Sequence, residues 1–187
     1  MATHPGASLY HLSGWRAVCE TAFGHPCPYL LAESDGRVVG VLPLVTIKSR
    51  LFGKFMVSLP YFNYGGALAH DEAARQALLD AACALARAEA CEHLELRDMH
   101  PMPDWPARTD KVSMWLALPA SADELWQGIG SKVRAQVKKA QGAQLTFSTG
   151  GPELLDDFYR VFSTHMRDLG TPVYAKRFFE IILKEAP

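Results

Sequence analysis

The sequence predicts a mixed α/β (α+β) fold whose sheet is mostly antiparallel. Residues 36–66 contain two apolar runs, at residues 38–47 and 55–59, separated by a short basic linker, which is typical of two strands joined by a turn. The turn Ser34-Asp35-Gly36-Arg37 joins the first run to a shorter apolar segment before it, as in a β-hairpin. An alanine-rich stretch at residues 71–90 has the composition of a long helix. Strands linked by short turns and followed by a covering helix indicate this fold class.

The first elements follow from their own patterns. Residues 8–23 carry an apolar stripe at helical spacing and are stopped by Gly24 and two prolines, and residues 29–33 form the strand before the turn. The run at residues 38–47 is apolar on both faces, as in a covered strand. Its Pro43 has no N–H to donate, so we expect a bulge or a splayed edge there.

The second apolar run ends in Pro60-Tyr61-Phe62-Asn63-Tyr64-Gly65-Gly66. Aromatic rings, one amide and two glycines suit the lip of a pocket, and they equally suit an ordinary loop at the end of a hairpin. Residues 93–97 and 112–118 alternate as two further strands. The expected core of this half is Val39, Val41, Leu44, Leu79 and Leu96.

The pattern changes after Pro119. A short helix at residues 122–127, a basic helix at 132–140, a strand at 144–148 and two helices, from residues 151 and 175, follow one another. A strand and helices without a sheet of their own do not complete a domain. We therefore expect residues 1–118 to form a first domain and residues 119–187 to form linker helices and the incomplete start of a second, so that the chain is a fragment.

Bulk composition limits the function. Apolar residues make up 49% and charged residues 21% of the 187 residues, and the net charge is −1, which excludes a protein that coats nucleic acid over its whole surface. Four cysteines show no C-x-x-C spacing, which favours reduced thiols over a disulfide framework or a metal site. No signal peptide or apolar run of about 20 residues is present, so we expect a cytoplasmic protein.

Several enzyme signatures are missing from the sequence. No G-x-x-x-x-G-K-[ST] loop is present, which argues against a nucleotide hydrolase. Asp98 and His100 follow a strand, but no nucleophile elbow accompanies them. His165 lies on an apolar helix stripe, where a histidine is more often a residue at the edge of the core than a base. Gly65-Gly66 lack the rest of the Q/R-x-x-G-x-G/A pattern of coenzyme A enzymes.

Two basic clusters are candidate binding surfaces. Lys48, Arg50 and Lys54 surround Leu51 and Phe52 in one hairpin tip, which suits a membrane surface or RNA and equally a solvated turn. In the basic helix, Arg134 and Lys138 lie four residues apart, so an anion would relieve their repulsion. A solvated helix face is the alternative for this second cluster.

The order of elements and a series of short motifs resemble the GNAT N-acetyltransferase fold and, more narrowly, FemAB-like proteins of the exosortase-associated (PEP-CTERM) kind, which carry two tandem copies of that fold. The motifs extend over nearly the whole chain, and from the resemblance we expect the first strand of the fold, before His4, to be missing. They are His4-Pro5…Tyr10-His11…Trp15, Gly40-Val41-Leu42-Pro43-Leu44, Ser49-Arg50-Leu51-Phe52-Gly53, Ser58-Leu59-Pro60…Asn63-Tyr64-Gly65-Gly66, Lys132-Val133-Arg134-Ala135-Gln136-Val137-Lys138-Lys139-Ala140 and Leu169-Gly170-Thr171-Pro172-Val173-Tyr174.

The resemblance implies an N-acyltransferase or aminoacyltransferase that modifies an amine of a cell-envelope precursor, such as one of peptidoglycan, or of an exopolysaccharide precursor. It implies no tightly bound cofactor, an aminoacyl-tRNA or acyl-CoA as donor, and a phosphate-bearing sugar-nucleotide or lipid-linked acceptor. A non-catalytic module that binds a polysaccharide or lipid-linked intermediate is the alternative. The expected substrate-binding residues are Asn63, Tyr64, Arg134, Lys138, Arg167 and Tyr174.

Overall fold

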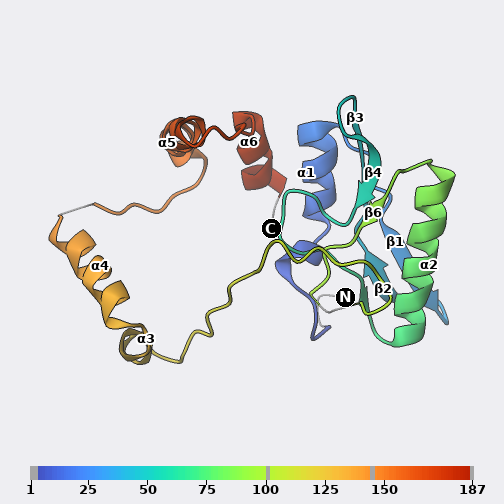
Figure 1. The fold of residues 1–187 in the computed structure, drawn as a ribbon, viewed down its shortest axis with the longest axis horizontal. Helices are drawn as coiled ribbons and strands as arrows, with labels where there is room; N and C mark the ends of the chain where they lie inside the picture. The colour runs from blue at the N-terminus through green and yellow to red at the C-terminus, as the bar shows by residue number, and fades with distance from the viewer. Residues whose placement is uncertain (1–3, 100–101, 144–145, 186–187) are drawn as a thin grey trace. The chain divides into compact units, whose positions relative to one another are not determined.

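The computed structural model describes residues 4–99, 102–143 and 146–185 (Figure 1). The chain divides into two compact units, one formed by Met1–Pro101 with Gly151–Pro187 and the other by Met102–Gly150. Each unit has its own elements and is described separately.

The first unit contains two small three-stranded sheets. One has the order β1 (Leu30–Ser34), β2 (Arg37–Leu42), β5 (Leu68–Ala69), and both of its strand pairs are antiparallel. The other has the order β3 (Val45–Ser49), β4 (Gly53–Val57), β6 (Leu94–Glu95), with β3 antiparallel and β6 parallel to β4. The predicted mixed α/β fold with mostly antiparallel strands is confirmed.

The chain passes from one sheet to the other at Pro43. The predicted single run ends as β2 at Leu42 and restarts as β3 at Val45, and Pro43 and Leu44 between them are fully buried. Because proline cannot donate to a ladder, the expected irregularity becomes a complete break in the strand. The two sheets therefore diverge from this point.

Helices cover the sheets of this unit. A 3₁₀ turn (Leu9–His11) leads into α1 (Gly14–Phe23), and α2 (Glu72–Ala88) follows β5. The Asp71 carboxylate accepts the Ala74 N–H at 2.8 Å and so caps α2. Near the C-terminus, a 3₁₀ turn (Pro152–Leu154) leads into α5 (Leu155–Asp168), and α6 (Lys176–Glu185) follows.

Two apolar clusters form the core of the first unit. Leu42, Leu44 and Met56 of the strands pack against Leu78, Ala82 and Ala86 of α2. Trp15, Val18 and Cys19 of α1 pack with Cys27, Val45 and Leu59 and with Phe178 and Ile181 of α6. Of the expected core residues, Leu44 and Leu79 are buried, whereas Val39, Val41 and Leu96 are half-buried.

Helix α6 thus completes a core that the sequence pattern assigned to residues 1–118 alone. The predicted boundary at residues 118 and 119 is drawn between two copies of a fold, whereas the two units of the structure are defined by their packing. The predicted boundary therefore stays a prediction.

The second unit contains α3 (Ala122–Gly128) and α4 (Ser131–Gly142), and the Ser121 hydroxyl caps α3 by accepting the Glu124 N–H at 3.2 Å.

The strand predicted at residues 112–118 is wrong. This segment is irregular, and its exposed apolar side chains are Val112, Met114, Trp115, Leu116 and Leu118. A strand needs a neighbouring strand in a sheet, and no described strand pairs with this segment. The strand predicted at residues 144–148 begins outside the described residues.

None of the helices in the described part of the chain has both the length and the apolar character needed to cross a bilayer.

Candidate functional site

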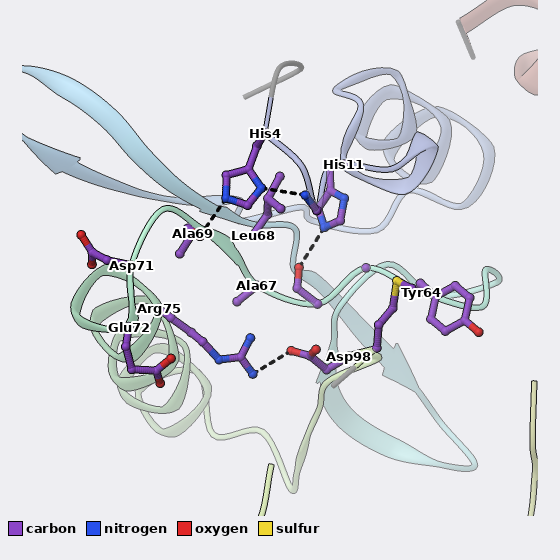
Figure 2. Close-up of a pocket in the computed structure, with 14 residues that line it drawn as sticks. His4, His11, Tyr64, Ala67, Leu68, Ala69, Asp71, Glu72, Arg75 and Asp98 are labelled. Carbon is purple, nitrogen blue, oxygen red and sulfur yellow. Dashed lines mark hydrogen bonds and ion pairs between the residues drawn. The ribbon is translucent and has the colours of Figure 1, made fainter. Parts of the chain in front are cut away.

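A pocket of about 320 Å³ lies in the first unit, where the loop after β4, the residues after β6 and the first turn of α2 meet (Figure 2). The N-terminal segment closes one side of it. Its lining residues are His4, Gly6, His11, Tyr64, Gly65, Gly66, Ala67, Leu68, Ala69, Asp71, Glu72, Arg75, Asp98 and Met99.

Hydrogen bonds between the segments that follow β4 and β6 hold the loop that lines this pocket. The Ser58 N–H donates to the Glu95 carbonyl at 2.9 Å, and the Arg97 N–H then donates to the Ser58 hydroxyl at 2.7 Å. Contact between the two segments resumes at Gly65, whose N–H donates to the Arg97 carbonyl at 3.1 Å. The intervening loop is therefore held at both ends, and the residues after it face the end of β6.

Backbone geometry explains why this loop ends in two glycines. A Cβ on Gly66 would lie 2.8 Å from the Asp98 carboxylate carbon. A Cβ on Gly65 would lie 2.6 Å from the Cβ atom of Leu59. Leu59 and Tyr61 adopt positive φ angles of 50° and 72°, which cost energy for residues with a side chain. Such strain persists only where surrounding contacts fix the loop, as they do here.

An ion pair spans the floor of the pocket. The Arg75 guanidinium donates to the Asp98 carboxylate at 3.0 Å, and Figure 2 shows the two side chains pointing toward each other from α2 and from the end of β6. The exposed fractions of the two side chains are 18% and 8%. Charges this shielded interact more strongly than surface pairs, and each depends on the other for compensation.

Two histidines fasten the N-terminal segment to the opposite wall. The Gly6 N–H donates to Nδ1 of His4 at 3.0 Å, so Nε2 carries the proton and donates to the Ala69 carbonyl at 3.0 Å. In the same way, the Ser8 N–H donates to Nδ1 of His11 at 3.2 Å, and Nε2 of that ring donates to the Gly66 carbonyl at 3.2 Å. Each ring has both nitrogens engaged in hydrogen bonds, so neither is placed to act as a general base.

Burial lowers the pKa of His11, although the hydrogen bonds with the Gly66 carbonyl and with Ser8 and the charge of Asp98 act in the opposite direction. The folded state therefore binds fewer protons than the unfolded chain, whose histidine pKa is about 6.5. The stability from neutral His11 is complete above that pH and is lost as the pH falls below it.

We expect the urea midpoint of unfolding to decrease between about pH 7 and pH 5, and a His11→Gln variant to show a shallower decrease. Glutamine can keep both hydrogen bonds but does not titrate. His165→Gln is the control, because that side chain is exposed on α5. An identical pH slope in His11→Gln and in the parent would contradict the assignment.

The pocket wall has an acidic balance. Among the described residues that line it, Asp71, Glu72 and Asp98 carry carboxylates, and Arg75 carries the one permanent positive charge. Such a wall favours an amine or ammonium group over a phosphate.

The pocket brings together only part of the predicted site. Tyr64 lines it, with its ring 5.8 Å from that of Tyr10, whereas Asn63 is exposed on the same loop and lies outside the lining. Tyr174 contacts Tyr61 edge-on with ring centres 5.7 Å apart, away from the pocket lining, and Arg167 is exposed and pairs with Asp168.

Arg134 and Lys138 lie in the second unit. The Arg134 guanidinium donates to carbonyl groups at the end of α3, those of Trp126 at 3.2 Å, Gln127 at 3.4 Å and Ile129. Lys138 is exposed on α4. An anion would have to share Arg134 with these carbonyls, and the anion-binding role of both residues stays a prediction.

Other candidate residues have different positions from those expected. His165 is exposed, so its assignment to the edge of the core is wrong. Lys54 is withdrawn from the hairpin tip, because its ammonium group donates to the Glu89 carbonyl at 2.6 Å and lies 3.1 Å from the Glu89 carboxylate. His100 lies outside the described residues. No cluster of three or more metal-binding side chains occurs among those that are described.

No protein-family model and no curated protein matches this chain. Among solved structures, the chain is similar to the crystal structure of FemX, with a TM-score of 0.59 and 20% sequence identity. The match covers 98% of this chain and 50% of FemX, so the chain spans half the length of that protein. The similarity shows a Fem-like, GNAT-type fold.

Proposed function

We propose that this chain belongs to an acyl- or aminoacyltransferase of the Fem type that modifies an amine of a cell-envelope or exopolysaccharide precursor. The observation that carries the proposal is the acid-walled pocket at the end of β6, built on a fold similar to that of FemX. The acceptor amine is the ligand group that this wall suits. The exosortase association expected from the sequence is part of the same proposal.

In the proposed reaction, the acceptor nitrogen attacks the carbonyl carbon of an activated acyl ester or thioester. A C–N bond forms, the bond from the carbonyl carbon to the leaving oxygen or sulfur breaks, and the proton from nitrogen passes through solvent to the leaving group. The pocket contributes by positioning: Glu72 and Asp98 attract the amine, and the ion pair with Arg75 holds the Asp98 side chain in place. Tyr64 forms one wall beside the acceptor.

The donor in this proposal is an aminoacyl-tRNA or an acyl-CoA, used as a co-substrate rather than as a bound cofactor. The acceptor carries phosphate, as a sugar-nucleotide or a lipid-linked intermediate. Arg134 and Lys138 on α4 are proposed to bind a phosphate group, and Arg167 and Tyr174 are separate proposed substrate contacts in the first unit.

Mass spectrometry tests the proposal directly. The chain is incubated with an amine-bearing sugar-nucleotide precursor and with each donor separately. The expected result is an increase in the acceptor mass by one acyl or aminoacyl group with one of the two donors. Binding of the acceptor without any mass change with either donor would contradict transfer and favour a binding module.

Glu72→Gln is expected to raise the acceptor KM about threefold to tenfold and to leave kcat nearly unchanged, because an exposed charge contributes to binding rather than to the chemical step. The matched control is Asp80→Asn, which removes a carboxylate from the same helix outside the pocket lining. Equal KM values for Glu72→Gln and the parent would exclude Glu72 from amine recognition.

A non-catalytic binding module is the second candidate function. Both nitrogens of His4 and of His11 are engaged in hydrogen bonds, so neither imidazole in the pocket is placed to remove a proton. That observation favours binding without chemistry, and the mass-spectrometric assay separates the two functions.

A further inference from the structure

The turn between β3 and β4 presents two large apolar side chains to solvent. Leu51 and Phe52 have exposed fractions of 80% and 70%, the highest among the large apolar side chains of the first unit that the structure describes. Figure 1 shows this turn at the far end of the β3–β4 hairpin. Neither residue belongs to the candidate pocket.

Local hydrogen bonds fix the shape of this turn. Ser49 pairs with Gly53 as the last pair of the ladder, and its hydroxyl accepts the N–H groups of Leu51 at 3.2 Å and Phe52 at 3.1 Å. Gly53 has a φ of 74°, and a Cβ there would lie 1.8 Å from a carboxylate oxygen of Glu92. The ordered backbone therefore holds Leu51 and Phe52 exposed instead of letting them fold back onto the protein.

The charges around the turn are positive in sum. Lys48 and Arg50 are exposed and form no ion pair with another described residue. Lys54 lies directly opposite Lys48 across the ladder but is compensated by Glu89. Together with the Glu92 carboxylate beside Gly53, these side chains leave a net charge of +1 at the tip of the hairpin.

We propose that this turn docks on the surface of an anionic lipid bilayer. Leu51 and Phe52 enter the boundary between headgroups and acyl chains, and Lys48 and Arg50 contact the lipid phosphates. RNA fits less well, because contacts with unpaired bases depend on stacked aromatic rings, and Phe52 is the one aromatic side chain at the apex. The proposal is independent of the transferase function, since it concerns a different surface.

Flotation with lipid vesicles tests the proposal on the whole chain. The parent is expected to float with vesicles made of equal parts of phosphatidylcholine and phosphatidylglycerol, and much less with phosphatidylcholine alone. Replacing Leu51 and Phe52 together by Ser is expected to lower the partition coefficient at least about tenfold. Replacing Lys48 and Arg50 together by Ser should lower it by a similar factor and remove most of its salt dependence.

Matched controls separate this turn from general surface effects. Leu31→Ser removes another exposed apolar side chain, 61% exposed on β1, and Arg37→Ser removes an exposed basic one; both should bind vesicles as the parent does. Phe52→Leu keeps an apolar apex and should retain binding within about threefold. Circular dichroism confirms that every variant is folded.

Three results would overturn the proposal. The first is a parent chain that does not bind the anionic vesicles, and the second is a Leu51/Phe52 double variant that binds them as tightly as the parent. The third is salt-dependent binding of tRNA that the Lys48/Arg50 variant loses, without vesicle binding, which would assign the turn to RNA.

Discussion

Replacing Asp98 with alanine is expected to lower the free energy of unfolding by about 3–5 kcal/mol. The substitution leaves the Arg75 guanidinium, only 18% exposed, without its carboxylate partner and without full access to water. The same change removes a carboxylate from the pocket wall, so binding of an amine-bearing acceptor should weaken as well. Urea unfolding followed by circular dichroism measures the first effect, and calorimetric titration measures the second.

An exposed ion pair provides the control for this substitution. Asp168 pairs with Arg167 at 2.9 Å, with exposed fractions of 59% and 75%, and Asp168→Ala should change stability by less than about 0.5 kcal/mol. Replacing Arg75 and Asp98 together by Met and Leu should cost less than Asp98→Ala alone, since no uncompensated charge remains. Equal effects of Asp98→Ala and Asp168→Ala on stability would mean that the Arg75–Asp98 ion pair is solvated.

The second large effect is expected from Phe178→Ala, which should cost about 3–5 kcal/mol. Phe178 of α6 is 5% exposed, and its ring centre lies 5.1 Å from that of Phe23 and 6.1 Å from that of Tyr61. Truncation leaves a cavity in the cluster built around α1. The urea midpoint of the whole chain measures the loss.

Phe147→Ala is the matched control, because the Phe147 side chain is 88% exposed and its removal should change stability by less than about 0.5 kcal/mol. If Phe178→Ala were equally mild, α6 would not belong to the core of the first unit, and that packed unit would end before residue 151.

Local signals predicted most of the helices and the hairpin strands. Asp71 caps α2 and Ser121 caps α3, as their positions before helical patterns indicate. Pro43 marks the break between β2 and β3, because the missing N–H acts at that residue alone. Strand pairing and helix packing between distant segments have no such local signal in the sequence. None of the strands that the structure describes pairs with the strand predicted at residues 112–118, and the packing of α6 on α1 depends on residues more than 150 positions apart.

The site was predictable only in part, for the same reason. The aromatic and glycine residues after β4 indicate a pocket lip, and Tyr64 lies there. Arg75 and Asp98 are separated by 23 residues on two different elements, and nothing in the pattern of either element indicates the other. His4 and His11 belong to one of the motifs on which the resemblance to FemAB-like proteins rests. Their hydrogen bonds to the Ala69 and Gly66 carbonyl groups are seen only in the folded chain.

The irregular segment at residues 112–118 has a consequence for handling the protein in solution. It is a run of exposed apolar side chains outside the described sheets, which is the kind of sequence that adds to a strand edge of another molecule. Lys111 and Pro119 flank it, and a charge and a proline at such positions oppose stacking of chains into fibrils. Concentrated samples should therefore form small reversible oligomers before they form insoluble aggregate.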